Sequence, residues 1–329
     1  QNNSSATILD RSVCLVLNRH YLGNYRKVKT SKVIEETGGS FSKETETTDP
    51  VTGDVTVTTT TIDSTKLSTT KTLVDSKELT PAMRVLRNAV AYLSTRAIPA
   101  HNVFGDRTYL VPLALVGEVD AKLNAFQQEL AEEAHSLAGR YMEAVAASAI
   151  ALGPLFKASE YPTPQAVEDA FGLDWNYVNF NAPEKLESVD KAAFAGAQRK
   201  YDEQIGAAYD EVKIVLRETL RQITAGVIDK LKPSSDGKPK IFRNSLLSDL
   251  TDFLGTFSLR NLADDGELEA VVAKLGRLTG GIDPQALRDM DTLRESVHAE
   301  LATTLGELDA LVTTGRRAIS FGDTLSMAS

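Results

Sequence analysis

The chain has 329 residues, of which 42% are hydrophobic and 25% charged, an ordinary balance for a soluble globular protein with a sizeable core. There is no run of eighteen apolar residues, so we expect no membrane-spanning helix. The polar start QNNSSATILD is not that of a signal peptide. The only cysteine, Cys14, can form no internal disulfide, and we expect it to be buried in a strand of a cytoplasmic protein.

The formal net charge of -9 argues mildly against a nucleic-acid partner, but the charge is unevenly distributed. Residues 1–80 hold ten basic and ten acidic side chains, so the rest of the chain carries the whole excess. Residues 11–32 hold six positive charges and no negative one, whereas residues 33–63 hold seven acids and one lysine. A phosphate backbone responds to charge within a Debye length of roughly 10 Å, so the local charge decides.

The first eighty residues have the composition of β-strands. SVCLVLNRHY and YRKVKTSKVI flank Gly23 and Asn24, a dipeptide typical of a two-residue hairpin turn, which predicts a basic hairpin. Farther on, KETETT and VTVTTTTI flank the turn-like DPVTGD, and thirteen threonines fall between positions 45 and 72. With few large apolar residues this arm cannot build a core. We therefore expect a protruding β-ribbon there, or else a mobile loop.

From Pro81 onward apolar residues recur every three or four positions, which indicates helices. Pro81 suits the first turn of a helix, where its missing N–H costs nothing. Long helices are predicted over residues 116–149 and 189–231, each about 50–65 Å long at 1.5 Å per residue. Such lengths imply an antiparallel helical hairpin or a coiled coil with another chain. A further helix of about thirty residues is expected from Pro284 to just before Gly315.

These patterns predict an α+β protein with a non-OB fold. We expect a β-rich segment over residues 1–80, with the basic hairpin and the threonine-rich arm, and an elongated, mainly helical domain with long antiparallel helices over residues 81–315. Residues 316–329 would form a C-terminal tail. The long helices favour a homo-oligomer.

Signatures of catalysis and of metal binding are missing from the sequence. DGKPK lacks the upstream glycine and the hydroxyl of a phosphate-binding loop, and the four histidines have no second ligand at a suitable spacing. The acidic pair Asp264 and Asp265 and the pair Asp289 and Asp291 suit helix starts or a solvated helix face. We therefore expect no enzyme activity, no metal and no cofactor.

The stretch NRHYLGNYRKVKTSK, residues 18–32, combines cations with rings and contains no acid. Proteins that bind single strands need both, because cations neutralise the backbone and unpaired bases stack on rings, at roughly 1–3 kcal/mol per base. Alternate residues of an extended arm share a face, so Tyr25, Lys27 and Lys29 would align. The predicted phosphate contacts are Arg19, Arg26, Lys27, Lys29 and Lys32, and the predicted stacking rings are Tyr21 and Tyr25.

Two more basic clusters follow. KLKPSSDGKPKIFRN would extend the binding track through Lys238, Lys240, Phe242 and Arg243. A smaller group near the C-terminus consists of Arg316, Arg317 and Phe321. The alternative for each cluster is a solvated face that improves solubility or pairs with acidic helices.

Several segments resemble an uncharacterised family of phage and bacterial proteins that are often encoded beside MoxR-type AAA ATPases. They are VCLVLNRHYLGNYRKV, the stretch from LSTRAIPAHNVFGDRTYLVP to GRYMEAV, AFGLDWNYVNFNAP, and KPKIFRNSLLSDLTDFLGTFSLRNLADDGELEAVVAKL. The likeness is one of segment order and spacing over most of residues 11–275. The threonine-rich insert at about 38–72 departs from it.

Size and layout also resemble the single-stranded-DNA-binding RNA polymerase cofactors of a group of podoviruses. That resemblance implies a protein of the infected host cytoplasm that binds unwound promoter DNA and recruits the phage RNA polymerase. An alternative is an adaptor of a MoxR-type AAA ATPase that binds no nucleic acid, and a third is a structural component of the virion. The resemblance implies no residue roles.

Overall fold

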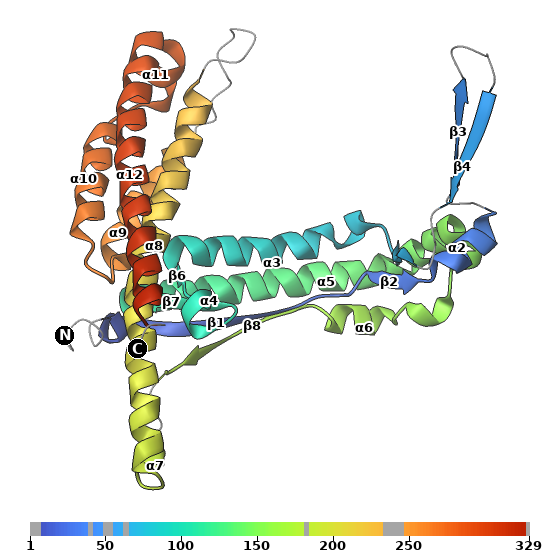
Figure 1. The fold of residues 1–329 in the computed structure, drawn as a ribbon, viewed down its shortest axis with the longest axis horizontal. Coiled ribbons are helices and arrows are strands. Elements are labelled where there is room, and N and C mark those ends of the chain that lie inside the picture. Colours follow the sequence, from blue (N-terminus) through green and yellow to red (C-terminus); the bar gives the residue numbers. More distant parts are fainter. Residues whose placement is uncertain are drawn as a thin grey trace. The chain divides into compact units, whose positions relative to one another are not determined.

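A computed structural model describes residues 8–38, 42–48, 55–61, 66–180, 184–232 and 247–326 of the chain (Figure 1). It is mainly helical with small antiparallel sheets, which confirms the predicted α+β class. The chain divides into two compact units, each built from segments far apart in sequence. Unit 1 comprises Gln1–Asn18, Asn88–Asn124 and Asp174–Ser329, and unit 2 comprises Arg19–Arg87 and Ala125–Leu173.

The strands form one four-stranded sheet of order β6-β7-β1-β8 and two two-stranded sheets, β2-β5 and β3-β4. Their bounds are β1 (Ser12–His20), β2 (Tyr25–Val28), β3 (Ser42–Thr48), β4 (Val55–Thr61), β5 (Thr69–Thr72), β6 (Ile98–Pro99), β7 (Thr108–Pro112) and β8 (Gly172–Val178). Cys14 on β1 is 2% exposed, which confirms the expected buried strand position. Burial raises the pKa of its thiol to about 11.

The helices include two of about forty residues. Their bounds are α2 (Thr30–Thr37), α3 (Ser76–Arg96), α4 (His101–Phe104), α5 (Val116–Leu152), α6 (Pro164–Asp169), α7 (Glu184–Glu187), α8 (Lys191–Leu231), α9 (Ser248–Arg260), α10 (Gly266–Thr279), α11 (Pro284–Asp289) and α12 (Asp291–Ser326), with single 3-10 turns at η2 (Leu113–Leu115), η3 (Gly153–Leu155) and η4 (Ala158–Glu160). The predicted long helices correspond to α5 and α8, so the apolar stripes identified both.

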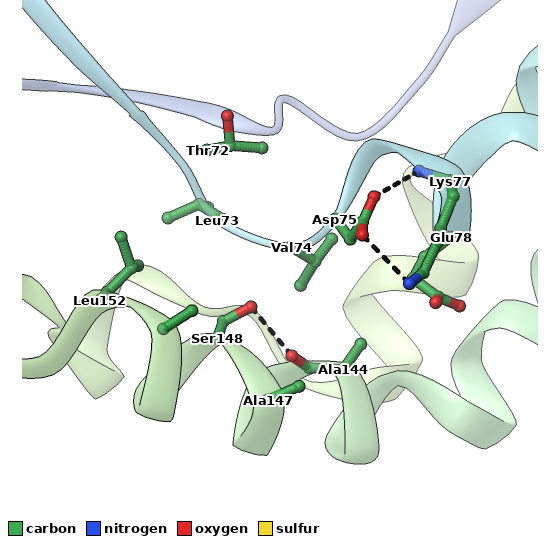
Figure 2. Close-up of a pocket in the computed structure, with 11 residues that line it drawn as sticks. Thr72, Leu73, Val74, Asp75, Lys77, Glu78, Ala144, Ala147, Ser148 and Leu152 are labelled. Carbon is green, nitrogen blue, oxygen red and sulfur yellow. Dashed lines mark hydrogen bonds and ion pairs between the residues drawn. The ribbon is translucent and has the colours of Figure 1, made fainter.

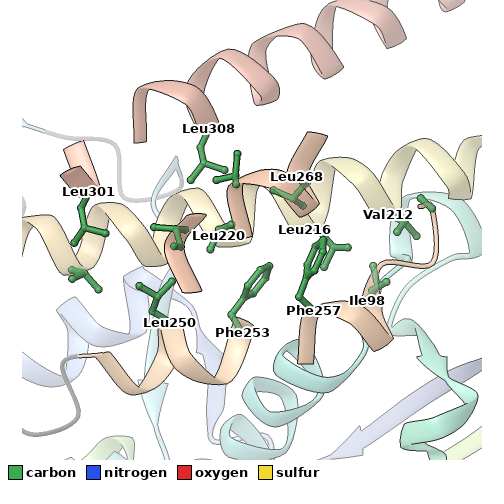
Figure 3. Close-up of a cluster of buried hydrophobic side chains, with 14 of the residues drawn as sticks. Ile98, Val212, Leu216, Leu220, Leu250, Phe253, Phe257, Leu268, Leu301 and Leu308 are labelled. Atoms are coloured by element: carbon green, nitrogen blue, oxygen red, sulfur yellow. The ribbon is translucent and has the colours of Figure 1, made fainter. Parts of the chain in front are cut away.

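The core of unit 1 lies where α8, α9, α10 and α12 meet. Figure 1 shows α12 running antiparallel to α8, so the antiparallel partner of α8 in unit 1 is α12, whereas the sequence predicted a hairpin of the helices over residues 116–149 and 189–231. Apolar side chains from all four helices interlock in Figure 3. Each large side chain buried in this way contributes about 1.5–3 kcal/mol to stability. Those labelled on the helices are Val212, Leu216, Leu220, Leu250, Phe253, Phe257, Leu268, Leu301 and Leu308.

A buried ion pair fastens α8 to the start of α10. The Arg217 Nε lies 2.6 Å from Oδ2 of Asp265, and the two residues are only 7% and 3% exposed. Arg217 also donates to Glu267 and to the carbonyl of Leu311 on α12. Asp265 caps α10 by accepting from the backbone N–H of Leu268. One arginine thus connects three helices.

Unit 2 has a smaller core between α3, α5 and α6, with Tyr141 as its largest fully buried side chain. The inner face of the β2-β5 sheet is closed by Lys71, whose ammonium lies 2.5 Å from both the carboxylate of Glu160 and the carbonyl of Leu155. On α5, Arg140 pairs with Glu78 of α3 at 3.1 Å. These contacts fix the loop and sheet that carry the candidate site.

The predicted basic hairpin is wrong. β2 pairs with β5 over Tyr25↔Thr72 to Val28↔Thr69, whereas β1 pairs with β7 over Ser12↔Pro112 to Val16↔Thr108. The second predicted arm also ends at Val28, because α2 begins at Thr30. Asn24 explains the outcome. Its side chain pairs with the backbone of Val74 fifty residues away instead of closing a turn.

The predicted β-ribbon in the threonine-rich arm is confirmed. β3 and β4 pair antiparallel from Ser42↔Thr61 to Thr48↔Val55. The side chains described on this ribbon, at residues 44–48 and 55–59, are all exposed. As expected, the arm adds no residue to the hydrophobic core described in either unit.

Two helix boundaries differ from the prediction. α3 begins at Ser76 instead of Pro81, because Asp75 accepts from the backbone N–H of Lys77 and starts the helix one turn earlier. The predicted single helix from Pro284 is broken at Met290, which adopts an extended conformation, and α12 then runs to Ser326. Gly315, which was expected to follow the helix, therefore lies inside α12. A single glycine lowers the stability of a helix by only about 1 kcal/mol, so it does not end this one.

Candidate nucleic-acid interface

The loop between β1 and β2 is held in place by Asn24. Its side-chain amide donates to the carbonyl of Val74 at 2.8 Å, and its side-chain oxygen accepts from the N–H of Val74 at 3.0 Å. The backbone carbonyl of Asn24 also accepts from the N–H of Leu73. Asn24 is 5% exposed, so these bonds are shielded from water. The loop that carries Tyr21 and Tyr25 is therefore anchored to the segment that follows β5.

Tyr21 and Tyr25 line one cavity of about 300 Å³ beside the first half of α3. Both rings are open to solvent, with 57% and 63% of their surface exposed. The α3 side contributes the apolar side chain of Met83 and the exposed Arg87. The volume of this cavity lies at the lower end of the range for ligand pockets. The two predicted stacking rings are thus brought together.

The two faces of the β2-β5 sheet differ in chemistry. The outer face carries Tyr25 and Lys27, with Thr72 and Thr70 directly opposite, and all four side chains are exposed. It presents a ring, a cation and two hydroxyls, and no carboxylate. Of the predicted alignment of Tyr25, Lys27 and Lys29, the first two share this face, whereas Lys29 lies beyond the end of β2 at the N-cap of α2.

Arg26 faces the other way. Its Nη1 donates to the carbonyls of Gly23 and Tyr25, each at 3.0 Å, so its guanidinium braces the loop backbone. It also acts on Tyr141 in the interior, where burial raises the pKa of the hydroxyl and the charge of Arg26 opposes that rise. We conclude that Arg26 is a structural residue of the loop first, and a source of positive potential second.

α2 carries its charges in the order that its dipole disfavours. Lys29 at the N-cap and Lys32 in the first turn place positive charge at the positive end, and Glu35 and Glu36 place negative charge in the last turn. Each such charge costs about 0.3–1 kcal/mol. An anion bound beside the N-terminal turn would offset this cost. Sequences that break a local rule in this way often do so at functional sites.

The other predicted cations of residues 18–32 differ in exposure. Arg19 is half-buried near the end of β1, and Lys27 and Lys29 are exposed. Within the described part of the chain, none of these three forms an ion pair with another described residue. The exposed side chains of Lys27 and Lys29 can be reached by an external anion.

The second predicted cluster lies outside the described residues. Lys238, Lys240, Phe242 and Arg243 all fall within residues 233–246. Arg316, Arg317 and Phe321 belong to α12, but their side chains are also outside the described part.

A second cavity of unit 2, of about 340 Å³, lies between the segment from Thr72 to Glu78 and α5 (Figure 2). Its α5 wall is made of small residues such as Ala144 and Ala147. Its polar side chains are engaged: Asp75 pairs with Lys77 at 3.1 Å, and Ser148 donates to the carbonyl of Ala144. We assign this cavity to packing between the segment and the helix, and not to the candidate interface.

Over the described ranges, no group of three or more histidine, cysteine, aspartate or glutamate side chains is placed to hold a metal ion. Likewise, no helix within the described residues is long and apolar enough to cross a bilayer.

Sequence reasoning missed the contribution of α3. Met83 and Arg87 complete the cavity of Tyr21 and Tyr25, yet they lie about sixty residues downstream. They belong to a helix in which the sequence pattern identifies only the buried side. A signal was present: Thr80, Met83 and Arg87 follow one another at helical spacing along the edge of the buried face, where Met83 is half-buried and the other two are exposed. The pairing of Asn24 with Val74 and the packing of Leu22 against the core of unit 2 place the loop beside these residues.

Comparison with protein-family models, with curated proteins and with solved structures finds no match to the chain. The family resemblance therefore stays an expectation, and the candidate interface rests on its own geometry.

Proposed function

We propose that the protein binds single-stranded DNA at unit 2, through the loop and sheet that carry Tyr21, Tyr25 and Lys27. The proposal rests on one observation, that exposed aromatic rings and a lysine side chain lie close together on unit 2. Two tyrosines with more than half of their surface exposed line one cavity, and Lys27 shares the outer face of β2 with one of them. An unpaired base would stack on the tyrosines while the adjacent phosphates contact the lysines.

The cations continue from the sheet into α2. From Tyr25 to Lys29 the backbone spans about 13 Å at roughly 3.3 Å per residue. Lys27 and Lys29 follow along this path, and Lys32 comes one helical turn later. Arg87 adds a positive charge on the α3 side of the cavity. This track fits a backbone that passes the cavity and ends at the N-terminus of α2.

The acidic character of the whole chain does not oppose this binding directly. Charges farther away than about 10 Å are largely screened at ordinary salt concentrations, so the short-range surroundings dominate. Glu35 and Glu36 lie at the opposite end of α2, and the carboxylate of Asp75, the residue after Val74, is paired with Lys77. Duplex DNA offers no unpaired base for the tyrosines, and we therefore expect a preference for single strands.

Substitutions at the two parts of the interface test its location by fluorescence anisotropy with an oligothymidine. Tyr25→Ala should weaken binding by about 5- to 100-fold, the equivalent of roughly 1–3 kcal/mol of stacking, without changing the salt dependence. Tyr25→Phe keeps the ring and should bind nearly as the wild type does. Lys27→Glu/Lys29→Glu should weaken binding and also flatten the salt dependence by about 1.4 in slope, from two lost phosphate contacts.

The matched control for the charge reversal is Lys191→Glu/Lys200→Glu. Both lysines are exposed on α8, and their reversal changes the net charge by the same amount at a distant place in the sequence. This control should bind DNA nearly as the wild type does. Equal losses in both double variants would mean that net charge, and not this interface, governs binding.

We further propose that the bound strand is unwound promoter DNA and that the partner is a phage RNA polymerase in the infected host cytoplasm. This part rests on the resemblance alone. Transcription by the phage polymerase from a pre-opened promoter should increase when the wild-type protein is added, and should not increase with Tyr25→Ala. Co-purification with an AAA ATPase, together with no effect on transcription, would instead favour an adaptor.

A further inference from the structure

Unit 1 buries an arginine that has no carboxylate partner among the described residues. Arg260, the last residue of α9, is 1% exposed. Its Nη2 donates to the carbonyls of Ser94 and Ala97, at 3.1 and 3.5 Å, so it binds the C-terminal end of α3. Its Nε has no hydrogen-bond partner within the described chain. The guanidinium also lies 5.2 Å from the ring centroid of Phe253.

Such an arrangement is unusual, because burying a charge without a counter-charge is costly. Arg217 in the same unit shows the ordinary solution, a buried guanidinium that is paired with Asp265. Burial and, to a smaller extent, the positive charge of Arg96 together lower the pKa of Arg260 to about 10, and the attraction of the nearby Asp252 only partly opposes them. Even so, Arg260 is protonated at neutral pH. An anionic group brought close to it would recover part of the lost interaction with water.

Arg260 borders a cavity of about 190 Å³ between α3, α8 and α9. This volume is below the range of roughly 300–1,000 Å³ for drug-sized ligands, so an occupant would have few non-hydrogen atoms. The walls include Ile223 and Phe253, and two carboxylates, those of Asp249 and Asp252, also line the cavity. The carboxylate of Asp252 is engaged by Arg96, at 2.7 and 3.2 Å. Asp249 lies one turn earlier on α9 and is exposed.

The mixture of charges restricts the ligand. A simple anion would be attracted by Arg260 but repelled by Asp249, and a simple cation would meet the reverse. A small molecule with both groups satisfies both ends of the cavity. We propose that this cavity binds a small zwitterion of the amino-acid type, with its carboxylate toward Arg260 and its ammonium group toward Asp249. The proposal concerns unit 1 and does not depend on DNA binding.

Isothermal titration calorimetry of the full chain with glycine, acetate and methylammonium as probes tests the proposal. Glycine should bind at least tenfold more tightly than either of the other two, because a hydrogen bond to a charged group supplies about this factor. Asp249→Asn should weaken glycine binding about tenfold and leave acetate binding unchanged or tighter. Replacement of Arg260 is expected to lower stability, because it holds α3, so Asp249→Asn carries the test.

The matched control is Asp210→Asn, which removes another exposed carboxylate of unit 1 from outside the cavity. It should bind glycine as the wild type does. The proposal is overturned if no probe binds, if glycine binds no more tightly than acetate, or if Asp210→Asn and Asp249→Asn weaken glycine binding equally. DNA binding by Asp249→Asn should equal that of the wild type, so the two sites fail or succeed separately.

Discussion

The double substitution Lys29→Asp/Lys32→Glu should stabilise α2 while it impairs DNA binding. Lys29 occupies the N-cap of α2 without a side-chain cap, and Lys32 is its third helical residue. Aspartate at the N-cap can accept from the free backbone N–H groups, and glutamate at the third position completes a capping box. The variant therefore gives α2 the residues that its local structure favours, in place of the cations that we assign to phosphate binding.

The magnitudes follow from position. An N-cap aspartate contributes about 1 kcal/mol, and reversal of the charge at Lys32 adds about 0.3–1 kcal/mol. Together these should stabilise α2 by about 1–2 kcal/mol, which corresponds to a roughly 5- to 30-fold smaller equilibrium constant for its opening. Two lost phosphate contacts should reduce the salt slope by about 1.4, which at 0.15 M salt corresponds to roughly tenfold weaker binding.

Native-state hydrogen exchange of the α2 amides measures the first effect, and anisotropy with an oligothymidine at several salt concentrations measures the second. Slower exchange together with weaker binding cannot arise from misfolding, because the same protein would be more ordered and less active. Unchanged affinity and slope would refute the assignment of Lys29 and Lys32 to phosphate contacts. Faster exchange would refute the argument from the helix dipole.

Other predictions concern the contacts that hold the two units. Arg217→Met should lower the free energy of unfolding by about 3–5 kcal/mol in urea titrations, because Asp265 would stay buried without its partner. As the control, Arg221→Met removes the more exposed ion pair with Asp309 and should lower the free energy of unfolding by less than about 1 kcal/mol. Equal losses in the two variants would contradict the reasoning. Burial raises the pKa of Asp265, but the stronger effect of Arg217 and of the Leu268 N–H lowers it overall. Its contribution to stability is therefore present above about pH 4 and lost as the pH falls through the lowered pKa, so the urea midpoint of Arg217→Met should fall less than that of the wild type between about pH 6 and 3. Asn24→Ala should cost about 2–3 kcal/mol and weaken DNA binding, because the backbone of Val74 loses both partners and the loop with Tyr21 and Tyr25 loses its anchor; DNA binding as tight as that of the wild type would show that the anchor is dispensable.

Periodic features were predictable from the sequence. The stripe from Val119 to Tyr141 identified α5, because a helix buries every third or fourth residue and the pattern persists over about six turns. The threonine-rich arm was recognised as a ribbon because its β-branched residues favour strands and its lack of large apolar residues leaves it outside any core. Both conclusions depend on local composition alone.

Features set by distant contacts were not predictable. Gly23 and Asn24 carry a strong local turn signal, yet the side chain of Asn24 forms two buried hydrogen bonds with the backbone of Val74, and β2 pairs with β5. No local sequence pattern predicts a hydrogen bond between residues fifty positions apart.

The candidate site shows the same division. Composition identified Tyr25 and Lys27 as ring and cation of one face, which the outer face of β2 confirms. The orientation of Arg26 toward the loop carbonyls could not be read from composition, because arginine suits a phosphate and a carbonyl equally well. From the sequence, Arg260 would likewise be expected to be an exposed cation, and only its contact with the end of α3 shows that it is buried.

The central claim, that a local group of rings and cations lets an acidic protein bind single-stranded DNA, is tested most directly by one titration series with the wild-type chain. Affinity for an oligothymidine and for a duplex of the same length is measured between about 0.05 and 0.5 M salt. With Arg19, Lys27, Lys29, Lys32 and Arg87 engaged, we predict a slope of about -3.5 for the single strand and weaker binding of the duplex. A flat salt response, or equal affinity for both, would contradict the claim.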